Sequence, residues 1–129
     1  MNTSYFASKL WKGKNAVAIS RGIPGWYRGR VYKALAPSWE LVNIKDEDIY
    51  RDRYKQQILD RLDPIKVFED LGQDAVLLCW ERSGEFCHRL LVAEWLEENL
   101  GIEVKELGVV NKANIIQREL PKYEQQSLF

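Results

Sequence analysis

The stretch that decides the fold is residues 75–96, which reads AVLLCW, then ERSGEF, then CHRLLVAEWL. Its six opening apolar residues do not alternate with polar ones, and such a run predicts a strand buried on both faces, as in a parallel sheet. The pair Ser83-Gly84 then marks a loop. Apolar residues recur at positions 91, 92, 95 and 96, the spacing of one helix face, and Gly101 is placed to end that helix. A further strand is expected over residues 102–107, which completes a strand–helix–strand unit.

Two more strands are expected earlier in the chain, over residues 4–7 and 16–20. A short helix over residues 31–35 follows, and then a connecting segment over residues 38–44 with an extended part at Leu41-Val42. These elements lead up to two longer helices.

The first long helix is expected to begin after Asp46, which is a good N-cap, and its apolar residues recur at helical spacing as far as Leu62. The pair Asp63-Pro64 predicts the start of the second helix, because proline suits the first helical position, and Gly72 ends it.

Together these elements predict an α/β fold, in a single small three-layer domain over residues 1–121. We expect a mostly parallel sheet of about four strands with helices on both faces. Residues 111–120 are expected to form a helix or a last strand, and residues 122–129 a separate C-terminal tail.

The bulk composition is that of an ordinary globular protein. The chain has 129 residues, of which 46% are hydrophobic and 29% charged, and its formal net charge is zero. A zero charge excludes a strongly basic nucleic-acid binder. Neither a signal peptide nor an apolar run of membrane-spanning length is found. We therefore expect a cytoplasmic protein whose two cysteines are reduced thiols, although a bridge between Cys79 and Cys87 is not excluded.

Reactive and charged residues gather where the decisive strand ends. Between positions 79 and 89 lie both cysteines, the single histidine and two arginines: Cys79, Arg82, Cys87, His88 and Arg89. Open α/β sheets bind ligands at the carboxyl ends of their strands. If the strand that ends before Arg21 is a neighbour of this one, Arg21 faces the same pocket.

The first turn of the helix that begins near Cys87 offers unsatisfied backbone N–H groups and the positive end of the helix dipole, which suit phosphate or carboxylate. The same field favours a nucleophilic Cys87 thiolate, with His88 as general acid or base. The predicted catalytic residues are Cys87, His88 and Glu81, the last in an orienting role. The predicted ligand-binding residues are Arg21, Arg82, Arg89 and Cys79.

Each of these residues also has a structural interpretation. Cys79 lies inside the apolar run and suits packing. His88 suits a hydrogen bond that ties the loop to the helix. Arg89, taken alone, suits a salt bridge with Glu85 or Glu81.

Spacing excludes two sharper enzymatic interpretations. The Cys-x5-Arg loop of a phosphatase is absent, because glutamate and alanine stand six places after the two cysteines. No glycine-rich nucleotide-binding fingerprint is present either. Zinc is an alternative, with Cys79, Cys87, His88 and Glu81 as ligands. Adjacent ligands at positions 87 and 88 lack the spacing of zinc fingers, so no metal site is predicted and the cofactor stays open.

The sequence Leu77-Leu78-Cys79-Trp80-Glu81, followed by Cys87-His88-Arg89 and an amphipathic helix, resembles the domain of unknown function 488 family. Ser20-Arg21-Gly22, together with Tyr50 and Tyr54 on a helix, is similar to other landmarks of that family. The resemblance covers most of residues 3–108.

The resemblance implies a small α/β domain with a polar pocket built from Arg21, Cys79, Glu81, Cys87, His88 and Arg89, to which we add Tyr54 as a ligand-binding residue. Members usually read Asp-Val-Arg where this chain has Ile19-Ser20-Arg21, so an acidic residue is missing here. As its name says, the family carries no established activity.

The last five residues resemble the short peptide by which bacterial proteins dock on the replicative sliding clamp. Gln125, Ser127, Leu128 and Phe129 match that peptide, and Gln126 stands where leucine is commoner. An exposed chain end with two apolar anchors suits a peptide-in-groove contact. The alternative is that Leu128 and Phe129 fold back on their own domain.

We therefore carry three hypotheses. The first is a domain that binds a phosphorylated compound, a nucleotide or a nucleic-acid end, and acts on it. The second is a non-catalytic nucleic-acid module, recruited to the clamp by its tail, with a contact face that includes Trp26, Tyr27, Arg28 and Arg30. The third is a Cys-His-Arg corner that only braces the fold.

Overall fold

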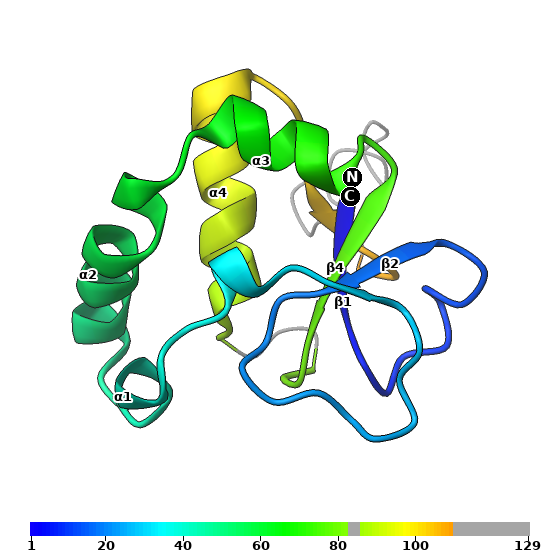
Figure 1. The fold of residues 1–129 in the computed structure, drawn as a ribbon, viewed down its shortest axis with the longest axis horizontal. Coiled ribbons are helices and arrows are strands. Elements are labelled where there is room, and N and C mark those ends of the chain that lie inside the picture. The colour runs from blue at the N-terminus through cyan, green and yellow to red at the C-terminus, as the bar shows by residue number, and fades with distance from the viewer. Residues whose placement is uncertain (83–85, 110–129) are drawn as a thin grey trace, which may run out of the picture.

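The computed structural model describes residues 1–82 and 86–109 (Figure 1). Its strands are β1 (Asn2–Tyr5), β2 (Asn15–Ala18), β3 (Arg30–Val31), β4 (Ala75–Cys79) and β5 (Lys105–Glu106). Its helices are the α-helices α1 (Trp39–Val42), α2 (Glu47–Gln57), α3 (Pro64–Leu71) and α4 (His88–Leu100), and the short 3-10 turns η1 (Lys33–Leu35) and η2 (Leu59–Arg61). The element predicted at residues 111–120 and the tail with Gln125, Ser127, Leu128 and Phe129 lie outside the described residues.

The described strands form one parallel sheet in the order β3-β2-β4-β1-β5. Strand β4 lies at its centre between β2 and β1, and all of its residues are buried, as its unbroken apolar run predicts. The predicted α/β class and the parallel sheet are confirmed. The sheet has five strands instead of about four, because β3 adds an edge strand that was not predicted, while β5 occupies only residues 105–106 of the strand expected over residues 102–107.

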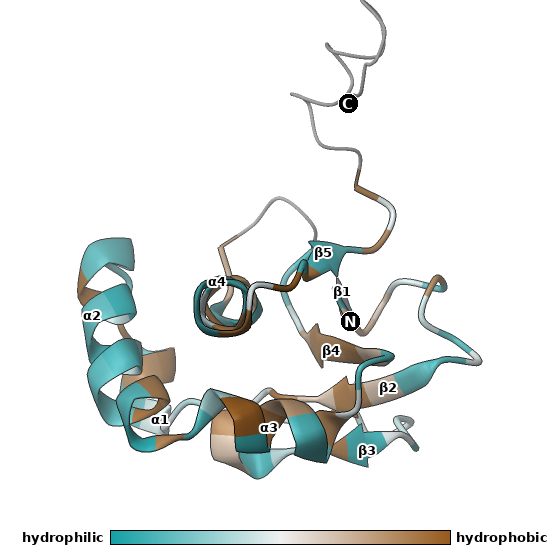
Figure 2. Ribbon diagram, turned by 90° about the horizontal axis from the view of Figure 1, so that it is seen from above, coloured by the Kyte–Doolittle hydropathy of each residue, from teal (hydrophilic) through white to brown (hydrophobic). Residues whose placement is uncertain are grey.

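The helices that bury side chains do so on one face of this sheet, shown by Figure 2 as the side that carries α2, α3 and α4. Their apolar residues form one cluster with the sheet. The sheet contributes Val17 of β2, Ile19 directly after β2, and Ala75 and Leu77 of β4. The expectation of helices on both faces is therefore wrong for the described residues.

Topology explains this one-sided arrangement. Crossovers between parallel strands are right-handed, so connections that run in opposite directions along a sheet cover opposite faces. The connections from β3 to β4 and from β4 to β5 run one way along the sheet. Within the described residues they contain all of the α-helices and both 3-10 turns. The connections from β1 to β2 and from β2 to β3 run the other way, and they consist of loops in the structure.

Aromatic side chains cover the second face in place of helices. Phe6, Trp11 and Tyr27, from the loops, pack against Ala18 and Leu78 of the sheet. The ring of Phe6 meets those of Tyr27 and Trp80 edge-on, with centroids 5.4 and 5.1 Å apart. Large aromatic rings give short loops enough apolar area to close a sheet face.

Capping signals were reliable guides to the helix starts. The side chain of Asp46 accepts a hydrogen bond from the backbone N–H of Ile49, and that of Asp63 accepts one from Ile65, directly before Pro64. Gly101 ends α4 in the left-handed conformation with φ of 67°. Helix α2 stops at Gln57, and η2 completes the stretch that was expected to be one helix.

Three local predictions were wrong. Strand β1 covers residues 2–5, earlier than expected. The segment predicted as extended at Leu41-Val42 lies in α1, because Ser38 caps a helical turn by accepting from the Leu41 N–H. The helix predicted over residues 31–35 is divided between the exposed edge strand β3 and η1. Among the described residues, no helix is both long enough and apolar enough to cross a membrane.

Candidate functional site

A pocket of about 350 Å³ opens at the carboxyl edge of the sheet. Its walls come from the segment after β2, the segment from Pro37 to the second turn of α2, the segment after β4, and the start of α4. The chain leaves the adjacent strands β2 and β4 in opposite directions, toward β3 and toward β5. Such a switch point in strand order is where open parallel sheets form a ligand crevice.

The predicted meeting of Arg21 with the Cys-His corner is found. Arg21, Cys87 and His88 all line this pocket, although they are far apart in the sequence. The backbone pairing that causes it continues beyond β2, where the N–H of Ile19 donates to the carbonyl of Leu78 at 3.0 Å. The Nε of Arg21 donates to the carbonyl of Pro37 at 2.8 Å, which holds the guanidinium at the pocket wall.

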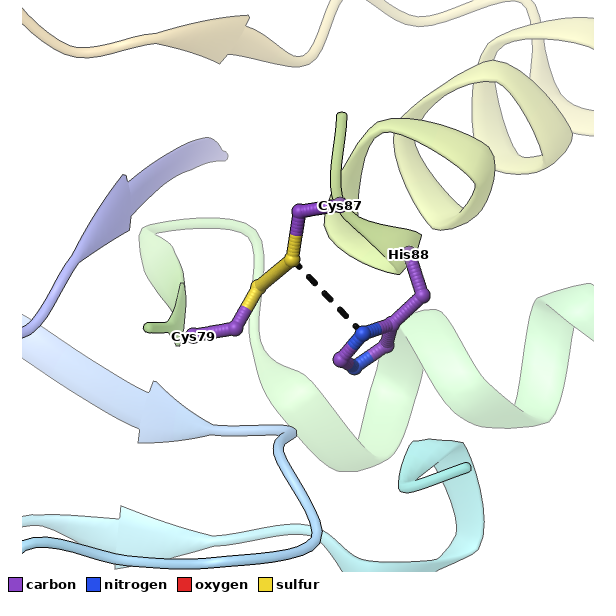
Figure 3. Close-up of side chains that lie close together, drawn as sticks. All are labelled: Cys79, Cys87 and His88. Atoms are coloured by element: carbon purple, nitrogen blue, oxygen red, sulfur yellow. Dashed lines mark hydrogen bonds between the residues drawn. A yellow bond between two sulfur atoms is a disulfide. The ribbon is translucent and has the colours of Figure 1, made fainter. Parts of the chain in front are cut away.

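His88 is 5% exposed, and both of its ring nitrogens have neighbours. Its Nε2 lies 2.6 Å from the carbonyl oxygen of Ile19. A carbonyl only accepts, so Nε2 carries the proton and Nδ1 presents its lone pair. That Nδ1 lies 3.6 Å from the sulfur of Cys87 (Figure 3).

His88 is neutral at pH 7. The pKa of the ring is lowered to about 4, mainly by burial and also by the positive charge of Arg89, against the opposing effect of the hydrogen bond to Ile19. A neutral ring with a fixed tautomer keeps Nδ1 available as an acceptor or a metal ligand.

Cys79 and Cys87 form a disulfide in the structure, which contradicts the expected reduced thiols (Figure 3). Cys79 ends β4 and Cys87 is the N-cap of α4, so the bridge joins the sheet to the helix. Both cysteines line the pocket. The predicted Cys87 nucleophile is therefore a state that the protein reaches only by reduction.

Arg89, a predicted ligand-binding residue, does not line the pocket. Its fully buried side chain makes a two-point pair with Glu106 of β5, with Nε–Oε1 and Nη2–Oε2 distances of 3.0 and 2.9 Å. Its Nη1 donates to the sulfur of Cys79 at 3.4 Å, and Thr3 of β1 donates to Glu106 at 2.6 Å. Arg89 therefore braces α4 against three strands. The salt-bridge interpretation was right in kind, but the partner is Glu106.

Tyr54, which was also predicted to bind ligand, lies outside the pocket wall. It is fully buried, and its hydroxyl donates to the carbonyl of Leu35 at 2.6 Å. Tyr50, one helical turn earlier, lines the pocket instead, with its ring stacked on that of Tyr54 at 6.0 Å. Burial and the nearby charge of Glu81 raise the pKa of Tyr50, so its hydroxyl stays protonated.

The remaining predicted residues divide between the pocket and the surface. Glu81 is exposed and lines the pocket. Arg82 is exposed and does not belong to the wall. The pocket residues for which no site role was predicted are mainly aromatic or charged, namely Trp39, Lys45, Glu47, Tyr50, Trp80 and Phe86. Trp80 directly follows β4, so its position at the carboxyl edge was a usable signal, whereas Trp39 to Tyr50 reach the pocket through α1 and the start of α2, which no local pattern indicates.

Fold and pocket together define a small parallel α/β protein with a pocket at its switch point. Residues 13–100 match the model of the Active DUF488-N3 subclade, DUF488-N3a. That match covers more than half of the chain, which therefore belongs to the domain of unknown function 488 family. Comparison with curated proteins and with solved structures found no match.

Replacing Arg89 with methionine is expected to lower the free energy of unfolding by about 3–5 kcal/mol, because the carboxylate of Glu106, which is only 11% exposed, loses its fully buried cation. The matched control is Arg51→Met, which removes exposed pairs with Glu47 and Glu94 and is expected to cost less than about 1 kcal/mol. Urea unfolding of both variants measures the difference. Equal costs would show that the Arg89–Glu106 pair does not brace the fold.

The stability of the disulfide form is expected to depend on pH through His88. The pKa of His88 in the folded protein is about 4, below the ordinary value of 6.5. Between these two pH values His88 is therefore protonated in the unfolded chain and neutral in the folded protein. The His88 contribution is complete above about pH 6.5 and is lost as the pH falls toward 4. From pH 7 to pH 5 the wild type should lose about 2 kcal/mol more than His88→Gln in urea unfolding. Equal losses in both proteins would refute this assignment.

Proposed function

We propose that the pocket binds a phosphorylated compound with an aromatic ring, either a nucleotide or the end of a nucleic-acid strand, and that the corner of Cys87 and His88 acts on it. One observation carries the proposal: Arg21, the start of α4 and this corner border a single pocket with aromatic walls. Its volume of about 350 Å³ falls within the range of small-molecule sites, roughly 300–1,000 Å³.

The anion is supported by two features of the pocket wall. Arg21 is exposed at the pocket, and within the described residues its guanidinium donates a hydrogen bond only through Nε, which leaves the Nη groups for a ligand. The first turn of α4 has no acidic residue, and its N-cap Cys87 makes no side-chain cap. Backbone N–H groups at a helix start that lack such a cap suit a phosphate group.

The aromatic ring is supported by Trp39 and Trp80. Both line the pocket, yet they are 63% and 52% exposed, which is unusual for such large apolar side chains. The indole N–H of Trp80 donates to the carbonyl of Gly22 at 2.8 Å, so this ring is held in place. Stacking of a base on an aromatic side chain contributes about 1–3 kcal/mol.

The acidic residues of the wall narrow the choice of ligand. Glu47 and Glu81 line the same pocket as Arg21 and Lys45, so the lining residues carry charges of both signs. Carboxylates repel additional phosphates and accept hydrogen bonds from sugar hydroxyls or base N–H groups. A single phosphate suits this wall better than a triphosphate, and Glu81 is the residue that orients the ligand beside the corner.

Reduced full-length protein should bind a nucleoside monophosphate, measured by calorimetry, and Arg21→Ala should weaken that binding about tenfold or more through loss of a charged hydrogen bond. The matched control is Arg28→Ala, since Arg28 is exposed, lies outside the pocket wall and bonds only to neighbouring carbonyls in the described residues. Cys87→Ser and His88→Ala should keep binding and lose turnover. Equal affinity of wild type and Arg21→Ala would end the proposal.

A second candidate is recruitment to the sliding clamp, and the residues Gln125, Ser127, Leu128 and Phe129 favour it. The contact face suggested for nucleic acid has changed, however. Tyr27 is buried, and the guanidinium of Arg30, although exposed, is engaged by Asn15 and by carbonyls of α3, so Trp26 and Arg28 remain for such a contact.

Deleting residues 125–129 should abolish co-purification with a bacterial sliding clamp and leave the thermal unfolding temperature unchanged. The double change Leu128→Ala and Phe129→Ala removes only the apolar anchors and should act like the deletion. A lowered unfolding temperature would instead indicate that these residues fold back on their own domain.

A further inference from the structure

Three good metal ligands converge at the corner of the pocket. The ligand atoms of Cys79, Cys87 and His88 all lie within 4.8 Å of one another, and the three side chains are buried. Figure 3 shows the two sulfur atoms and the imidazole ring of His88 pointing toward one another from β4 and the start of α4. We propose that in the reduced protein these residues bind a zinc-class divalent cation, with one coordination position open to the pocket.

The distances suit this ion. The sulfur of Cys87 and Nδ1 of His88 are 3.6 Å apart. Zinc binds thiolate sulfur at about 2.3 Å and imidazole nitrogen at about 2.0–2.1 Å, which on a tetrahedron separates the two ligand atoms by about 3.6 Å. The Cα atoms of Cys79 and Cys87 lie 7.4 Å apart. That spacing lets two thiolates stand about 3.8 Å apart on the same ion.

The surroundings hold the ligands as metal sites require. The Nε2–H of His88 donates to the carbonyl of Ile19, which directs the lone pair of Nδ1 toward the two sulfurs. The Nη1 of Arg89 donates to the sulfur of Cys79, and the Arg89–Glu106 pair fixes that donor. Such outer contacts orient ligands, and their removal typically costs about 10–100-fold in metal affinity.

The ligand set also selects the kind of ion and the kind of site. Two thiolates and an imidazole favour zinc over magnesium or calcium, which prefer oxygen. Three protein ligands with a fourth position open to solvent are typical of reactive zinc sites, whereas structural sites have four protein ligands. All three residues line the pocket, so the fourth position faces its interior.

The metal site forms only after the disulfide between Cys79 and Cys87 is reduced. A phosphine reduces the Cys79–Cys87 disulfide, and one water molecule supplies the oxygen of the phosphine oxide and the two protons of the thiols. The cation then displaces both thiol protons into solvent, and the two thiolate charges neutralise it. This site goes beyond the proposed function, because it does not depend on which compound the pocket binds.

The test uses the full chain, stripped of metal and kept reduced by a phosphine. Co²⁺ should bind at one equivalent and give thiolate-to-metal charge-transfer bands with a tetrahedral spectrum. Zn²⁺ titrated in competition with a colorimetric chelator should displace it. Cys87→Ser should lower zinc affinity by at least about 100-fold. Serine is a favourable N-cap, so this variant is expected to fold.

Cys79→Ser and His88→Gln should lose affinity similarly, and far-ultraviolet circular dichroism checks that each variant is folded. Arg21→Ala is the control: it should keep full zinc affinity while losing nucleotide binding, so the two proposals fail separately. A cobalt spectrum without thiolate bands would overturn the metal site. Equal zinc affinity of wild type and Cys87→Ser would overturn it as well.

Discussion

The pairing of β2 with β4 is the constraint on which the rest of the structure depends. These strands run in register, with Ala18 opposite Leu78, and the ladder continues to Ile19. It places Ile19, Ser20 and Arg21 beside the end of β4. Without that alignment the carbonyl of Ile19 would not meet His88, and Arg21 would not share a pocket with Cys87. The site is thus a product of backbone hydrogen bonds in the centre of the sheet.

The second support of the site is the buried pair of Arg89 and Glu106. Its position shows why α4 can present Cys87 and His88 at a fixed place: the next residue is anchored to β5, and through Glu106 to Thr3 of β1. Three consecutive residues therefore have three different tasks. Cys87 joins the helix to β4, His88 to the end of β2, and Arg89 to the edge of the sheet.

The sequence was informative wherever a signal is local. The apolar run of β4, the caps Asp46 and Asp63 and the glycine that ends α4 are each determined within a few residues. The meeting of Arg21 with His88 was also predictable, because it follows from two buried strands being neighbours. The partner of Arg89 was not, since β5 carries only two residues and its place beside β1 is a long-range outcome. Tyr54 and Tyr50 could not be separated, because both are buried on one face of α2, and only the packing around them decides which one lines the pocket.

The link between Cys79 and Cys87 spans a sequence separation of eight residues and closes a loop that carries Trp80, Glu81 and Phe86. These three side chains form part of the pocket wall. The segment that carries them is held by the disulfide in addition to its connections to β4 and α4. Reduction of this one bond frees two sulfur atoms beside the pocket and removes a covalent restraint on its wall. The thiol chemistry of the corner and the restraint on the pocket wall therefore change together.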